Sequence, residues 1–142
     1  MLHPSAMNPL NACRCELIWD ESRAATAETP SGQLLQVEEK GNWTPGRMLS
    51  MAVQSSLMFE FFRLAEEAGL EVLGYVSNAA TTQEEPQMRM VVLPCILLEA
   101  ESDIPRGEEL LHQAFTSSRI CRLLGSGLDL DARFVASKLA LA

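Results

Sequence analysis

The longest apolar segment of the chain lies between residues 45 and 68, and its pattern predicts a helix. Thr44 can cap the free N–H groups at its start, and Pro45 suits the first helical position, where an N–H would be unpaired anyway. Gly69 is typical of the residue that follows a helix. Apolar residues surround nearly the whole helix, and a polar stripe occurs only in its last two turns. Such a helix needs burial on most sides, so the pattern favours a second layer from a partner subunit.

Alternating apolar residues predict strands on both sides of this helix. Ahead of it, residues 13–22 and 33–39 predict a hairpin, with residues 28–32 as its turn. After it, residues 70–82 and 87–102 are rich in β-branched and apolar residues and predict an antiparallel hairpin.

The C-terminal part of the chain predicts more helix and one further strand. Residues 104–127 are helical in pattern, and either Ser117 or Ser118 can interrupt them and cap a second, shorter helix. Residues 127–137 alternate apolar with charged positions, which indicates a half-exposed strand. In the hairpin ahead of these elements, Pro94 marks an edge or a bulge, because proline cannot donate to a ladder.

The order of these elements is β-β-α-β-β-α-β, which predicts an α+β fold. The chain has 142 residues, with no internal repeat and no linker long enough to separate two domains. We therefore expect one domain over residues 1–142, in which residues 1–11 form a loose N-terminal arm.

The charge of the chain narrows the range of partners. Eleven basic residues against nineteen acidic ones give a formal net charge of −8. This balance predicts no binding to nucleic acid or to an anionic membrane surface, because both would be repelled. No apolar run approaches the roughly 18 residues of a spanning helix, and the first residues do not have the pattern of a signal peptide. We therefore expect a cytoplasmic protein.

Cysteine and histidine are the residues most able to bind a metal. The chain contains Cys13, Cys15, Cys95, Cys121, His3 and His112. The C-x-C spacing of the first two cysteines fits no common zinc pattern, and the histidines do not complete one. The sequence predicts neither a metal nor another cofactor. We expect the four thiols to be small buried hydrophobes rather than ligands or disulfides.

Three segments resemble a known family when taken in order. They are "TPGRMLSMAVQSSLMFEFF" from residue 44, "GLEVLGYVSNA" from residue 69 and "HQAFTSSRICRLL" from residue 112. From about Cys13 to Phe134, the chain is similar to the OsmC/Ohr family of thiol-dependent organic hydroperoxide reductases. The resemblance implies an OsmC-like fold with a buried central helix. It also implies an intertwined homodimer in which the central helices pack together.

The resemblance also assigns four site positions. It places the family's reactive cysteine at Ser56, eleven residues after Pro45, and the second cysteine at Ser118. The family's glutamate falls on Gly46, and its arginine falls on Arg23. Reduction of a peroxide needs a thiolate that becomes a sulfenic acid, and a second thiol then resolves it. A serine hydroxyl cannot follow this chemistry, so the resemblance implies a non-catalytic member of the family.

Two interpretations of the serines stay open. They can line a remnant interface pocket that binds a small apolar ligand, or Ser56 can be an inert filler that bonds the carbonyl four residues earlier. The alternative function is an active reductase that uses Cys121 or another thiol. Cys121 lies one turn from Ser118, where a helix N-terminus would lower its pKa. A serine hydrolase is disfavoured, because six residues of helix turn His112 about 120° away from Ser118.

Overall fold

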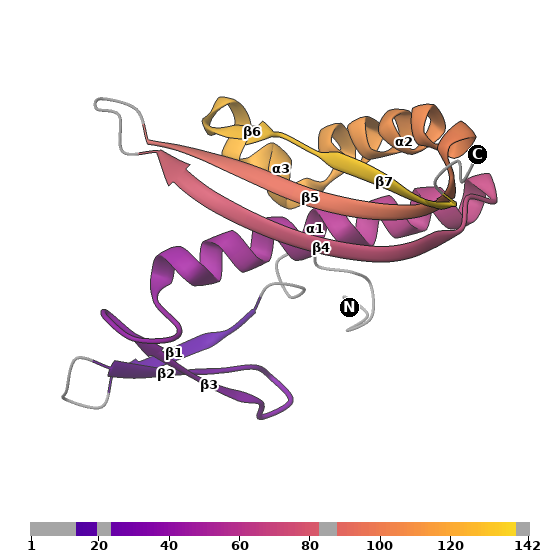
Figure 1. The fold of residues 1–142 in the computed structure, drawn as a ribbon. Helices are drawn as coiled ribbons and strands as arrows, with labels where there is room; N and C mark the ends of the chain where they lie inside the picture. The colour runs from indigo at the N-terminus through magenta and orange to yellow at the C-terminus, as the bar shows by residue number, and fades with distance from the viewer. Residues whose placement is uncertain (1–13, 20–23, 83–87, 139–142) are drawn as a thin grey trace, which may run out of the picture. The chain divides into compact units, whose positions relative to one another are not determined.

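The computed structural model describes residues 14–19, 24–82 and 88–138, and these residues divide between two compact units (Figure 1). The first unit is Met1–Met48 and the second is Leu49–Ala142. The predicted arm of residues 1–11 lies outside the described residues, and a single domain over the whole chain stays a prediction.

The first unit contains a three-stranded antiparallel sheet in the order β1-β2-β3. Its strands are β1 (Glu16–Trp19), β2 (Ala24–Glu28) and β3 (Leu34–Glu38). The turn between β2 and β3 has the predicted position: Gly32 has a φ of +89°, and the Thr29 hydroxyl accepts a hydrogen bond of 3.1 Å from the Gln33 N–H.

The predicted pairing of this hairpin is wrong. Residues 13–22 were expected to pair with residues 33–39, but β3 pairs with β2, and β1 pairs with the other edge of β2. The sequence Ala-Ala-Thr-Ala-Glu of β2 contains three alanines, which are depleted in strands and give no apolar alternation. Pairing on both sides therefore stabilises this strand, rather than its own propensity.

The central helix α1 (Pro45–Ala68) has the predicted ends. The Thr44 hydroxyl accepts a hydrogen bond of 3.2 Å from the Arg47 N–H, as expected of an N-cap. Gly69 has a φ of +70°, in the left-handed region that glycine adopts without strain. The Arg106 guanidinium donates a hydrogen bond of 3.0 Å to the carbonyl of Ala68, which satisfies one of the free carbonyls at the end of the helix.

The sheet of the second unit is built around β5. Its strands are β4 (Val72–Thr82), β5 (Arg89–Ala100), β6 (Leu128–Leu130) and β7 (Arg133–Lys138). The β4–β5 hairpin is antiparallel, as predicted, whereas β6 and β7 both pair with β5 in parallel. The predicted strand of residues 127–137 is thus present in two pieces, with a break at Asp131 and Ala132.

Pro94 does not mark an edge, because β5 has neighbours on both sides. β6 pairs with residues 90–92 of β5, and β7 pairs from Cys95 onwards. Pro94 lies between these two stretches, where the ladder is already interrupted. Its missing N–H therefore removes no ladder hydrogen bond on this side.

The segment between β5 and β6 contains the predicted helices. α2 (Ile104–Ser117) and α3 (Arg119–Leu124) are separated by Ser118, and short 3-10 turns lie at Glu101–Asp103 and Gly125–Gly127. α2 packs closely on the sheet at Gly107. A Cβ atom there would lie 2.9 Å from the side chains of Leu98 and Phe134.

One core cluster joins α1, α2 and one face of this sheet. The buried residues of α1 are Val53, Gln54, Leu57, Phe61 and Ala65. They repeat at the helical spacing of three and four residues, so they form a single face. The opposite face carries exposed apolar side chains, with Phe59 66% exposed and Met51 48% exposed. Within one chain, α1 is therefore buried on one face, and its cover by a partner subunit stays a prediction.

Candidate functional site

The hydroxyls of Ser56 and Ser118 form a hydrogen bond of 2.6 Å, although 62 positions separate them in the sequence. Ser56 lies in the middle of α1, and Ser118 lies between α2 and α3. The expected approach of these two positions is confirmed. The two positions at which the resemblance implies a reactive cysteine and its partner therefore lie in contact within one chain.

Ser118 is held in place by its role in the backbone. Its φ of −61° and ψ of 124° are extended, so it ends α2 and acts as the N-cap of α3. Its N–H donates to the Ala114 carbonyl at 2.8 Å, and its hydroxyl accepts from the Cys121 N–H at 3.4 Å. The side chain is only 3% exposed. Both the direction of the hydroxyl and its burial are therefore fixed by the junction of two helices.

The neighbouring serines of α1 have different partners. Ser55 donates to the Met51 carbonyl at 2.7 Å, which is the bond four residues back that was considered for Ser56. Ser56 bonds to Ser118 instead. Consecutive residues of a helix point about 100° apart, so only one of the pair can face α3. Ser56 is therefore the residue that connects the two helices.

A charged cluster lies one turn along α1 from Ser56. The Glu60 carboxylate accepts a hydrogen bond of 3.0 Å from the Ser117 hydroxyl and pairs with Arg63 at 2.5 Å. Arg63 also pairs with Glu67 at 2.8 Å. The hydrogen bond from Arg63 lowers the pKa of Glu60. Sequence reasoning missed this cluster at the site, although the spacing of these charges by three and four residues was a signal for it.

Cys121 lies beside the serine pair but is poorly placed for thiolate chemistry. It is buried, and this burial raises the pKa of its thiol, although a hydrogen bond with Ser118 acts in the opposite direction. The expectation that the start of α3 lowers this pKa is therefore wrong, because desolvation outweighs the helix terminus. Tyr75 of β4 is affected in the same way: burial, with Cys121 nearby, raises its pKa to about 12.

The structure does not bring the remaining residues considered from the sequence, Gly46, Arg23 and His112, into contact with the serine pair among the described residues. Gly46 lies in the first turn of α1 with open space around it, and Arg23 lies outside the described residues. His112 is exposed on α2, and no hydrogen bond between it and Ser56 or Ser118 occurs among the described residues. The arrangement needed for a serine nucleophile with a histidine base is thus not present there.

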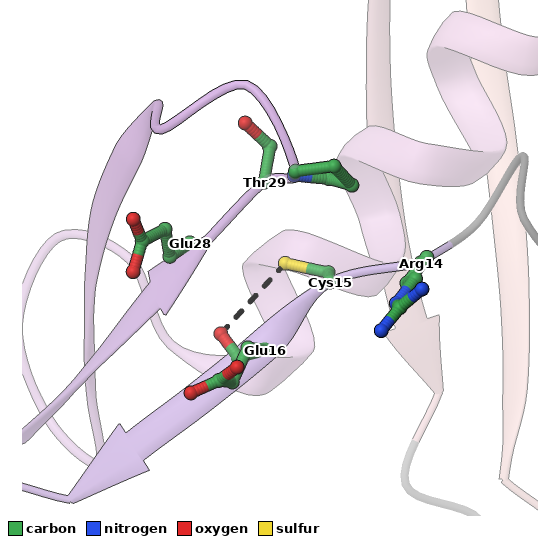
Figure 2. Close-up of a pocket in the computed structure, with 6 residues that line it drawn as sticks. Arg14, Cys15, Glu16, Glu28 and Thr29 are labelled. Carbon is green, nitrogen blue, oxygen red and sulfur yellow. Dashed lines mark hydrogen bonds between the residues drawn. The ribbon is translucent and has the colours of Figure 1, made fainter.

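The prediction that the cysteines are buried holds only for Cys121. Cys15 and Cys95 are free and exposed, whereas Cys13 lies outside the described residues. Cys15 precedes β1 and lies at an open cavity of about 550 Å³ (Figure 2). Cys95 follows the alternation of buried residues in β5 and lies between the buried Pro94 and Ile96, so it is on the sheet face that is turned away from the core. This outward position explains the exposure of Cys95.

The described residues contain no group of three or more histidine, cysteine or acidic side chains that could hold a metal ion. Among the helices of the described part of the chain, none combines the length and the hydropathy needed to cross a membrane.

Comparison with known proteins gives a match at the level of structure. No protein-family model matches the chain, and no curated protein matches it significantly. An OsmC-like protein from Vibrio cholerae superposes with a TM-score of 0.72 at 17% identity, over 84% of this chain and 97% of that one. An OsmC-like protein from Mycoplasma pneumoniae gives 0.72 at 11% identity, over 87% and 95%. The organic hydroperoxide resistance protein OhrB of Bacillus subtilis gives 0.63 at 10% identity, over 86% and 98%. The chain therefore has the fold of the OsmC and Ohr proteins.

Proposed function

We propose that this chain is an OsmC-like protein, related to the thiol-dependent organic hydroperoxide reductases, that does not catalyse their reaction. One observation carries the proposal: the hydrogen bond of 2.6 Å between the Ser56 and Ser118 hydroxyls, at the two positions where the resemblance implies cysteines. The scaffold for a reactive pair is retained, and the sulfur atoms are replaced by oxygen.

The chemistry of oxygen supports a non-catalytic role. In a thiol peroxidase, a thiolate attacks the O–O bond, one oxygen stays on sulfur as a sulfenic acid, and a second thiol displaces it as water and forms a disulfide. Neither hydroxyl of the serine pair can accept an oxygen atom in this way. Gly46 also lacks the carboxylate that the resemblance implies at the start of α1.

The alternative of a reductase based on Cys121 is disfavoured by the surroundings of that thiol. A raised pKa leaves less of the reactive thiolate near neutral pH. The hydroxyl next to it belongs to Ser118, which cannot resolve a sulfenic acid. A reaction at Cys121 would need an external thiol to reach a buried sulfur.

A homodimer and a ligand pocket belong to the same proposal. Leu49, Met51 and Phe59 of α1 are exposed in a single chain, and a second copy packed on this helix would remove them from water. Burial of one such side chain contributes roughly 1.5–3 kcal/mol. The remnant pocket would lie at this interface and take a small apolar ligand. A cytoplasmic location fits the exposed free thiols of Cys15 and Cys95, which a reducing compartment preserves.

The test is turnover of an organic hydroperoxide in the presence of a dithiol reductant. We expect no activity of the wild-type protein above the uncatalysed rate. A Cys121→Ala variant serves as the control: robust turnover by the wild type that disappears in this variant would establish the reductase and identify its nucleophile. Turnover that persists in the variant would equally refute the proposal, and would point to Cys13, Cys15 or Cys95 instead.

A further inference from the structure

A second cavity lies away from the serine pair, between α2 and the broken strand β6–β7. Its volume is about 290 Å³. Five apolar side chains line it: Ile104, Leu111, Leu130, Ala132 and Phe134. Glu108 and His112 of α2 complete the lining. A cavity of this size, below the usual range for drug-sized ligands, fits a small molecule with an apolar body.

The cavity exists because one residue in the inward-facing row of the strand is short. Leu130, Ala132 and Phe134 alternate with exposed residues, so their side chains point towards α2. The backbone does not leave the sheet at this point, since the Asp131 N–H still donates to the Val92 carbonyl at 2.9 Å. The space therefore lies in the side-chain layer above Ala132, where a larger residue would fill it.

The lining has a charge without a counter-ion in the described structure. Glu108 and His112 are one helical turn apart on α2, and both are exposed. Neither forms an ion pair among the described residues. Arg106, on the preceding turn, is directed to the Ala68 carbonyl instead. A carboxylate beside an apolar floor is complementary to a ligand that combines a cation with a hydrophobic group.

We propose that this cavity is a binding site for a small hydrophobic amine. The ammonium group pairs with the Glu108 carboxylate, and the apolar body lies over Ala132 between Leu130 and Phe134. The His112 ring covers the outer side of the bound molecule. This inference does not depend on the state of the serine pair, since none of the lining residues takes part in that site.

The test uses benzylamine as the probe and isotope-labelled protein in NMR titrations. We expect saturable shifts of the resonances of α2, β6 and β7, with a Kd of about millimolar, as is usual for so small a ligand. Benzyl alcohol, which has the same apolar body without the charge, should bind more weakly. Glu108→Gln should weaken the binding of benzylamine about two- to fivefold, which is the range for an exposed ion pair.

Two further variants keep the proposal open to refutation. Glu109→Gln makes the same change of charge at the next, exposed residue of α2, outside the cavity, and should leave the affinity unchanged. Ala132→Leu fills the cavity and should abolish the shifts. The proposal is overturned if Glu109→Gln weakens binding as much as Glu108→Gln, or if the alcohol binds as well as the amine. Absence of saturable shifts, or shifts that map to other elements, would overturn it too.

Discussion

Replacing both Ser56 and Ser118 by cysteine should place a disulfide between α1 and α3. The two hydroxyl oxygens are 2.6 Å apart, and C–S bonds are longer than C–O bonds, so the sulfur atoms can reach bonding distance with little movement of the backbone. We therefore expect the bridge to form within one chain on mild oxidation.

The size of the effect follows from the length of chain that the bridge closes. The two positions are 62 residues apart, and the loss of entropy in the unfolded chain for such a loop corresponds to about 4 kcal/mol. Native-state strain usually lowers the realised value to about 2–4 kcal/mol. For a chain of this size, about 3 kcal/mol raises the Tm by roughly 10 °C.

The assay compares the Tm of the oxidised and the reduced double variant, and peptide mass mapping identifies the bridge. Ser55→Cys with Ser118→Cys is the matched control, because the Ser55 side chain is directed to the Met51 carbonyl and away from α3. The reasoning is refuted if the first variant forms no bridge, or if the control forms one as readily. A bridge that stabilises by less than about 1 kcal/mol would refute the assumption that the site is prearranged.

Three further changes test other parts of the structure. Gly107→Ala should destabilise by up to about 2 kcal/mol in urea unfolding, because its Cβ would lie 2.9 Å from the buried Leu98 side chain. The Cβ added by Gly46→Ala would meet nothing within 4 Å, so this substitution should instead stabilise by up to about 1 kcal/mol. Equal effects of Gly107→Ala and Gly46→Ala would contradict the close packing of α2. Tyr75→Phe should not destabilise at neutral pH, since the buried hydroxyl has no partner among the described residues. The phenol of Tyr75 has an ordinary pKa of 10.0 and a pKa of about 12 in the folded protein. The free energy of unfolding of the wild type should therefore fall as the pH rises from 10 to about 12, and the variant should not show this loss. The Cys121 thiol should react with an aromatic disulfide reagent only on unfolding, and fast reaction in the native protein would contradict its burial.

The sequence predicts the elements that carry strong local signals. The Thr44 cap, the glycine after α1 and the break at Ser118 all depend on chemistry within one or two turns, and each lies where its residues indicate. β2 could not be found in this way, because its alanines have no pattern of their own and its pairing is set by the strands on either side. The role of Pro94 was missed for a similar reason: it depends on where two later strands end.

The candidate site shows the same division between local and non-local information. The contact of Ser56 with Ser118 followed from the resemblance, since no local pattern connects residues so far apart. The exposure of Cys15 and Cys95 was not predictable from residue type alone, because free cysteine is usually buried. The raised pKa of Cys121 depends on how much of the core covers it, which the position at the start of a helix does not reveal.

The exposed apolar face of α1 has a consequence for every measurement of stability. If a second copy covers Met51 and Phe59, folding and association form one equilibrium. Mass action then lowers the free energy of unfolding of the dimer by about 1.4 kcal/mol for each tenfold dilution of the protein. The Tm would fall on dilution, whereas that of a monomer would stay constant. The effect of any substitution should therefore be compared at one fixed protein concentration.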